Sequence, residues 1–191
     1  MTRRSLSTVG FALGLVLSGA SCAASFGGEP ICSKPDEAIM VLEAQSVPSA
    51  TRLPCVAELP IGWMFGDIVV NDAGTTLWLD HDRAGVHALE VELTESCDTS
   101  AGVEVPPGPD EVGMRVFQEP TSLAPYSGTR SLTFEGGCIV YRYRFAQNAE
   151  PALVLEADRA MSSVARTSVV SAVQRELDVS VCGAGAPGCV G

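Results

Sequence analysis

Histidines and carboxylates gather at one point in the middle of the chain. Asp80, His81 and Asp82 are consecutive, and His87 follows a few residues later. Carboxylate oxygens and imidazole nitrogens are common ligands of divalent cations. The spacing matches no calcium loop, because an EF-hand places its ligands at fixed positions with an obligatory glycine and a closing glutamate. We therefore expect no metal here and interpret the segment as a solvated loop between two strands.

Two pairs of charged residues lie at the spacing of a strand. Glu90 and Glu92 share one face, with carboxyl groups roughly 7 Å apart, a separation that would suit a glycosidase. Glycosidase clefts are rich in aromatic residues, whereas this chain has only two Trp and three Tyr, so an exposed strand face is the preferred interpretation. Arg142 and Arg144 repeat the spacing. They could hold an anionic ligand, but we expect them to pair with carboxylates of the adjacent strand.

The chain contains no motif that is typical of nucleophilic catalysis. There is no Gly-x-Ser-x-Gly elbow and no Ser-x-x-Lys, and the only histidines are His81 and His87. A Ser/His/Asp triad that uses either histidine stays open, since such triads are defined by geometry and not by sequence. We name no catalytic residue, no metal ligand and no cofactor. The sequence favours a binding or accessory module over an enzyme, with a secreted hydrolase lacking a recognisable motif as the alternative.

The first 24 residues have the order of a bacterial export signal. Arg3 and Arg4 are followed by an apolar run from Val9 to Leu17, and then by small residues up to Ala24. Nine apolar residues are too few to cross a bilayer, which takes about 20, so a cleaved signal fits better than a membrane-spanning anchor. The sequence therefore predicts an exported protein.

The end of this signal resembles the lipobox of bacterial lipoproteins. Small residues, Gly19-Ala20-Ser21, precede Cys22, although a lipobox usually has leucine where this chain has Gly19. The resemblance implies that Cys22 carries a lipid and holds the protein on the outer face of the cell membrane. The alternative is ordinary cleavage, for example after Ala23 or Ala24, and release as a secreted protein.

The remaining cysteines are expected to form disulfides. The chain has seven, and six remain whether Cys22 is lipidated or removed with the signal. Spaced cysteines in an exported chain favour disulfides over zinc, and no Cys-x-x-Cys pair is present. Six cysteines allow fifteen pairings. The preferred set is Cys32–Cys55, Cys97–Cys138 and Cys182–Cys189.

The charge of the chain limits its partners. The formal net charge is −11, and loss of Arg3 and Arg4 with the signal makes the mature chain more acidic still. Such a surface repels nucleic acid and anionic lipid headgroups. We therefore expect no nucleic-acid partner, contact with the membrane only through a lipid at Cys22, and an envelope partner or ligand that the sequence does not identify.

The segments that must position these residues are expected to include both helices and strands. Residues 1–24 are the signal, 25–32 a tether and 33–191 a single extracytoplasmic domain. Helices are expected at Ala38–Ala44 with Ser33 as N-cap, where a strand is the alternative, from Glu150 to about Ser162, and after a cap at Thr167. Residues 49–60 are expected to form a loop. Strands are expected at Trp63–Asn71, Thr75–Asp80, Val86–Thr94, Met114–Gln118, Thr129–Glu135, Cys138–Phe145 and Val179–Cys182. This order predicts an α+β fold with one mostly antiparallel sheet of about five or six strands and helices on one face, braced by disulfides.

Several short segments resemble uncharacterised secreted proteins of high-GC Gram-positive bacteria. They are Ala44-Gln45-Ser46-Val47-Pro48, Leu53-Pro54-Cys55, Asp82-Arg83-Ala84-Gly85, Gly136-Gly137-Cys138 and the tail that begins at Cys182. The resemblance spans most of the mature chain. It implies the compartment and assigns no activity.

Overall fold

The fold is built on one large antiparallel sheet. A computed structural model describes residues 28–123, 125–178 and 181. The signal, Cys22, the pair Cys182–Cys189 and most of the strand expected at Val179–Cys182 lie outside the described residues. The strands are β1 (Arg52–Val56), β2 (Trp63–Asn71), β3 (Gly74–His81), β4 (Gly85–Thr94), β5 (Val103–Val105), β6 (Arg115–Gln118), β7 (Ser122–Leu123), β8 (Tyr126–Phe134), β9 (Gly137–Arg144) and β10 (Met161–Ala165). The helices are α1 (Ala38–Ser46), α2 (Leu153–Ala160), α3 (Arg166–Leu177) and the short 3-10 helix η1 (Pro109–Glu111).

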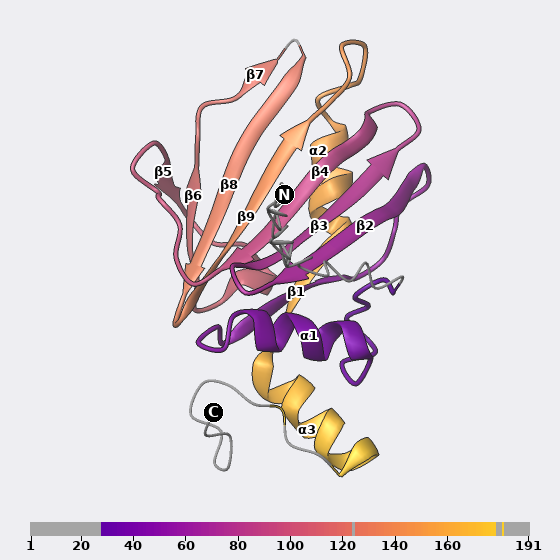
Figure 1. Ribbon diagram of the computed structural model, residues 1–191. Coiled ribbons are helices and arrows are strands. Elements are labelled where there is room, and N and C mark those ends of the chain that lie inside the picture. The colour runs from indigo at the N-terminus through magenta and orange to yellow at the C-terminus, as the bar shows by residue number, and fades with distance from the viewer. Residues whose placement is uncertain (1–27, 124, 179–180, 182–191) are drawn as a thin grey trace, which may run out of the picture.

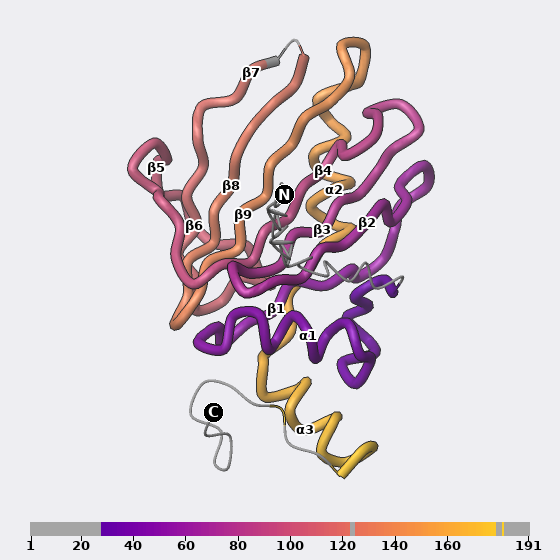
Figure 2. Tube along the Cα trace, in the orientation of Figure 1, coloured from indigo at the N-terminus to yellow at the C-terminus, as the bar shows by residue number. Residues whose placement is uncertain are grey.

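The main sheet confirms the α+β class but is larger than expected. Its order is β2-β3-β4-β9-β8-β6-β5, with β7 paired to β8 as an eighth strand. The added strands, β5 and β7, lie in segments where the sequence analysis places no strand. The sheet twists along its width, so β8 and β9 run more steeply than β2 and β3 in Figure 2.

A second, two-stranded ribbon corrects two predictions. β1 lies within residues 49–60, which were expected to form a loop. β10 begins where a helix was expected to continue to Ser162, because α2 ends at Ala160. The two strands pair antiparallel, with Pro54 opposite Ser163. A two-stranded ribbon has only edge strands, which is where proline is tolerated in a sheet.

The two faces of the main sheet differ sharply. The inner face carries the alternating core residues of β4 and β9, which are Leu89, Val91, Leu93, Ile139, Tyr141 and Tyr143, all at most 5% exposed. The outer face carries the intervening polar residues, among them Glu90, Glu92 and Arg142. The alternation predicted for both strands is confirmed over these residues.

The helices α1, α2 and α3 pack against different parts of the fold. α2 packs on the inner face, where Glu156 accepts a hydrogen bond from Trp63 and Asp158 accepts one from Tyr143. α1 contacts β2 and β3, and α3 contacts α1 and β10, so α3 lies below α1 in Figure 1. The expectation that all helices cover one sheet face is therefore wrong for α3.

The helix starts also differ from expectation. α1 has Glu37 at its N-cap, where Ser33 was expected, and α3 has Ala165, where Thr167 was expected. Arg166, at the start of α3, is buried and donates hydrogen bonds to the carbonyls of Ala44 and Val47 at the end of α1. A guanidinium is well suited to the unsatisfied carbonyls of a helix C-terminus.

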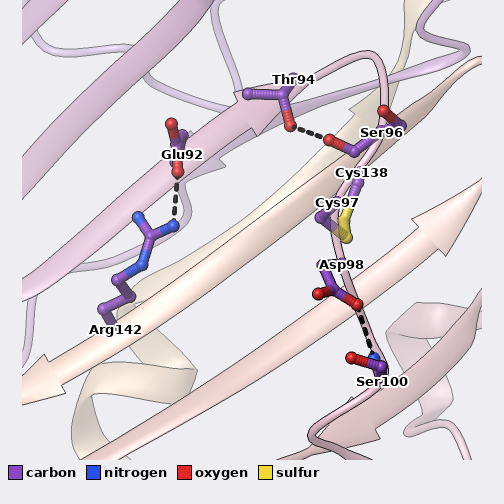
Figure 3. Close-up of a disulfide and its surroundings, with 8 residues drawn as sticks. All are labelled: Glu92, Thr94, Ser96, Cys97, Asp98, Ser100, Cys138 and Arg142. Carbon is purple, nitrogen blue, oxygen red and sulfur yellow. Dashed lines mark hydrogen bonds and ion pairs between the residues drawn. A yellow bond between two sulfur atoms is a disulfide. The ribbon is translucent and has the colours of Figure 1, made fainter.

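Two of the expected disulfides are present. Cys32 is joined to Cys55, and Cys97 is joined to Cys138. The second bridge lies on the outer face, where it fastens the segment that follows β4 across the sheet (Figure 3). Thr94 donates to the carbonyl of Ser96, and Asp98 accepts from the amide of Ser100, so local hydrogen bonds shape this segment on either side of the bridge.

Candidate functional site

The histidines and carboxylates of this segment stay close in pairs, with His81 Nδ1 3.2 Å from Asp82 Oδ1, but they do not form one cluster. His81 is buried at 2% exposed, whereas Asp82 and His87 are exposed. Asp80 accepts a hydrogen bond from the backbone amide of His87 at 2.7 Å. Among the described residues, no three His, Cys, Asp or Glu side chains gather in the way that metal ligands do.

His81 was expected in a solvated loop, and its burial corrects that expectation. Its Nδ1 accepts hydrogen bonds from the amides of Arg83 and Ala84, at 3.0 and 3.1 Å. Nε2 of the same ring is buried and has no hydrogen-bond partner among the described residues. The imidazole thus holds the turn between β3 and β4 and packs 4.8 Å from the ring of Trp63.

His87 lies on the opposite face from the one that strict alternation predicts. The pattern placed it with Leu89 on the inner face. In the structure its ring stacks on Trp78 at 5.2 Å, and Trp78 donates to Glu90 on the outer face. His87 has a φ of 52°, a left-handed conformation that interrupts the pleat and turns the side chain over.

The charged pairs form one network on the outer face. Arg142 bonds Glu90 at 2.8 Å and Glu92 at 2.7 Å, and Arg144 bonds Glu90 at 3.2 Å. Figure 3 shows Arg142 directed toward Glu92. The pairing expected for both arginines is confirmed. Burial alone would raise the pKa of Glu90, but hydrogen bonds from Trp78 and Arg142 and the charge of Arg144 lower it overall. Arg142 forms ion pairs with both Glu90 and Glu92, so these two carboxylates have a structural role.

The candidate site lies on the inner face instead, beside α2. Two cavities of about 190 and 330 Å³ share Arg130 and Asp158 in their linings. We call the two cavities together the α2 groove. The smaller cavity is also lined by η1, Tyr141 and the serines of β10, and the larger by Tyr126, Tyr143 and Leu155. The groove therefore collects side chains from distant parts of the chain around one arginine and one aspartate.

Arg130 reaches the groove from β8. It stands opposite Tyr141 in the register, and its guanidinium holds Glu111 of η1 through two bonds, at 2.6 and 2.8 Å. Glu111 also accepts a hydrogen bond of 2.6 Å from the backbone amide of Gly108. This bond fixes the loop before η1. Burial alone would lower the pKa of Arg130, but Glu111 raises it overall. The arginine is fully charged and already neutralised by its partner.

Asp158 reaches the same point from α2. It accepts a hydrogen bond from the hydroxyl of Tyr143. Burial raises the pKa of Asp158 and outweighs the hydrogen bond from Tyr143 and the charge of Arg130, which lower it. Burial, and then the negative charge of Asp158, also raise the pKa of Tyr143. The site thus contains a carboxyl group that gains a proton more readily than an exposed aspartate does.

Tyr141 supplies a hydroxyl without a partner. Its side chain lines the smaller cavity and is only 5% exposed. Its neighbours Tyr143, Arg130 and Glu111 are hydrogen-bonded, but among the described residues the Tyr141 hydroxyl has no protein partner. Burial is the main cause that raises the pKa of Tyr141, so the group stays neutral and can both donate and accept a hydrogen bond.

These groove residues were missed in the sequence, although one signal was visible. Arg130 has the same parity along its strand as Leu132, so alternation puts a charged residue on the core side. Such a residue is costly unless it is paired. Its partners, Glu111 and Asp158, come from segments that carry no local pattern for this contact, so the sequence alone could not assemble the cluster.

No family model, curated protein or solved structure matches the chain. Among the described residues, no helix is both long and apolar enough to cross a membrane. The two disulfides indicate an oxidising, exported environment. Interpretation of the site therefore depends on its own geometry.

Proposed function

We propose that the protein is an exported binding module of the cell envelope, attached through a lipid on Cys22, and that the α2 groove binds a small polar ligand. The observation that carries the proposal is the hydroxyl of Tyr141. Its side chain is only 5% exposed and lines the smaller cavity, and a polar group that no protein group satisfies bonds to water or to a ligand. An unpaired hydroxyl in a cavity lined by fixed charges is a group that a ligand can satisfy.

The rigidity of the groove supports binding. The Glu111 carboxylate is fixed by Arg130 and by the Gly108 amide, and Asp158 is fixed by Tyr143. Arg130 stands on β8 and Asp158 on α2, and the bonds of Glu111 tie the short helix η1 to them. A site that is formed in advance loses little entropy when a ligand enters.

The alternative predicted from the sequence, a secreted hydrolase, has less support. The smaller cavity contains Ser162 and Ser163, which could in principle be nucleophiles. A serine needs a neighbouring base, and neither His81 nor His87 lines the two cavities. His81 instead uses Nδ1 to hold backbone amides. The arrangement favours recognition over covalent chemistry.

The proposal is tested by NMR titration of the mature protein with three probes of different charge, agmatine, glucose and citrate. At least one should shift the amide signals of Arg130, Tyr141 and Asp158. Tyr141→Phe should weaken that binding by about tenfold, the equivalent of one hydrogen bond of about 1.4 kcal/mol.

The control is Thr76→Val, which removes a hydroxyl from the outer face, opposite Glu92. This change should leave binding intact. If none of the three probes perturbs the groove, or if Tyr141→Phe and Thr76→Val have equal effects, the groove is not the binding site.

A further inference from the structure

We propose that the ligand of the α2 groove is a small organic cation, whose ammonium or guanidinium group is held between the Asp158 carboxylate and the Tyr141 hydroxyl. This inference rests on the proposed function and names the chemical class of the ligand. It follows from the charge that remains in the groove after the internal pairs are formed, and from the hydrogen-bonding groups left open there.

The fixed charges of the smaller cavity leave a negative excess. Asp110, Glu111 and Asp158 line it, and Arg130 is the one basic residue in its lining. The bonds between Arg130 and Glu111, at 2.6 and 2.8 Å, cancel that pair. Asp110 and Asp158 then set the sign of the site. An anion would have to displace Glu111 from Arg130 and approach a protein whose formal net charge is −11.

The open hydrogen-bonding groups are those that a cation needs. The one hydrogen bond of Asp158, from Tyr143, uses Oδ1, so among the described residues Oδ2 is left as an acceptor. Tyr141, Ser162 and Ser163 line the same cavity, and each carries a hydroxyl that can accept a hydrogen bond. An ammonium brings three donors and a guanidinium five, which matches a wall of acceptors better than a neutral or anionic group does.

The ligand would also compete with a proton. Because burial raises the pKa of Asp158, lowering the pH protonates this carboxyl earlier than an exposed one. The titratable and charged groups that interact with it come from η1, β8 and β9, and are Glu111, Arg130, Tyr126, Tyr141 and Tyr143. A cation prefers the ionised form, so its affinity should rise with pH through the pKa of Asp158 and then level off.

The test is calorimetric titration of the mature protein with agmatine, which carries one guanidinium and one ammonium group. Agmatine should bind more tightly than glucose or citrate. Asp158→Asn should weaken its binding by at least tenfold and remove the rise of affinity with pH. The matched control is Asp72→Asn in the exposed turn between β2 and β3, which should change neither the affinity nor its pH dependence.

The outcomes separate this inference from the proposed function. If glucose or citrate binds the groove and agmatine does not, the ligand is not a cation, and the groove is still a binding site. If Asp158→Asn and Asp72→Asn weaken agmatine binding equally, the cation is attracted only by the acidic surface, and the inference is wrong. If no probe reaches the groove, both proposals fail.

Discussion

At the scale of the residue, His81 shows how a side chain that looks catalytic can be structural. Two backbone amides converge on Nδ1, so the imidazole does for the β3–β4 turn what an asparagine or serine side chain does in many turns. The ring lies in a small space, because a Cβ at Gly62 would stand only 2.9 Å from Nε2. The turn therefore depends on a buried acceptor at this position.

Replacing His81 should destabilise the protein even when the new side chain fills a similar volume. His81→Leu fills similar space but leaves the amides of Arg83 and Ala84 without a partner, which should lower the free energy of unfolding by about 1–3 kcal/mol. His81→Asn keeps an oxygen close to the place of Nδ1 and should lose less. Urea denaturation of both variants measures the difference, and equal losses would show that the acceptor is unimportant.

Glu43 is a second buried residue whose chemistry affects stability. It is fully buried on α1, and neither carboxyl oxygen has a hydrogen-bond partner among the described residues. Burial raises the pKa of Glu43 well above its ordinary value of 4.5. Between the ordinary and the raised pKa the folded protein holds a proton that the unfolded chain has lost. The free energy of unfolding should therefore fall as the pH rises through this range.

Glu43→Met should remove this fall of the free energy of unfolding with pH. At pH values above the ordinary pKa of Glu43, the variant should also be more stable than the wild type by about 1–3 kcal/mol. The reason is that an unsatisfied carboxyl group is replaced by an apolar side chain of similar size. Urea denaturation across mildly acidic to mildly basic pH provides the measurement. Glu58→Met, at an exposed position before β2, serves as the control and should keep the fall. A fall that persists in Glu43→Met would mean that another group causes it.

At the scale of the element, the structure separates what local pattern determines from what it does not. β2 and β3 were predicted from the residue types of their own segments, and in the turn between them Asn71 accepts a hydrogen bond from the amide of Ala73. The β1–β10 ribbon was not predicted, because it joins Arg52 to Ala165 across most of the chain. No short-range pattern contains such a pairing, and Pro54 argued against a strand.

The same distinction holds for the candidate site. Alternation along β9 puts Tyr141 and Tyr143 on one face and Arg142 on the other. The cluster itself needs α2 and η1 to meet the sheet, which depends on packing between segments far apart in sequence. The sequence therefore predicts which residues of β9 share the face that lines the α2 groove, but it does not predict that α2 and η1 pack beside them.

The Cys97–Cys138 disulfide should stabilise the elements around the outer face. It closes a segment with a sequence separation of 41 residues, for which the loop-entropy relation gives about 4 kcal/mol. Replacing both cysteines by alanine should lower the free energy of unfolding by up to this amount. Amide hydrogen exchange should also quicken between Ser96 and Ser100, because the bridge fastens this segment to β9.

The matched control for this change is the double replacement of Cys32 and Cys55. Cys32 and Cys55 are separated by 23 residues in the sequence. For this separation the loop-entropy relation predicts that the free energy of unfolding falls by about 3 kcal/mol when the bridge is removed. This variant should leave exchange between Ser96 and Ser100 unchanged, since it loosens the start of the domain instead. If the segment exchanges equally fast in both variants, the Cys97–Cys138 bridge does not hold it specifically.

At the scale of the whole molecule, the acidic charge decides how the protein can be held at a membrane. A formal net charge of −11 repels anionic headgroups. If Cys22 carries a diacylglyceryl group, its two acyl chains would hold the protein without electrostatic attraction, since two chains suffice for stable anchoring where one does not. Attachment should then be insensitive to salt.

Cys22→Ala should accordingly remove both the lipid and the attachment. The wild-type protein, expressed in a bacterium that modifies lipoproteins, should incorporate a palmitate analogue and stay in the membrane fraction after a high-salt wash, because screening does not weaken a hydrophobic anchor. The variant should be unlabelled and soluble. Ser21→Ala, which keeps a small residue before the cysteine, is the control and should retain the label. An unlabelled wild-type protein whose mature chain begins after Ala23 or Ala24 would overturn the anchor. Export would still hold, since the disulfides need an oxidising compartment in either case.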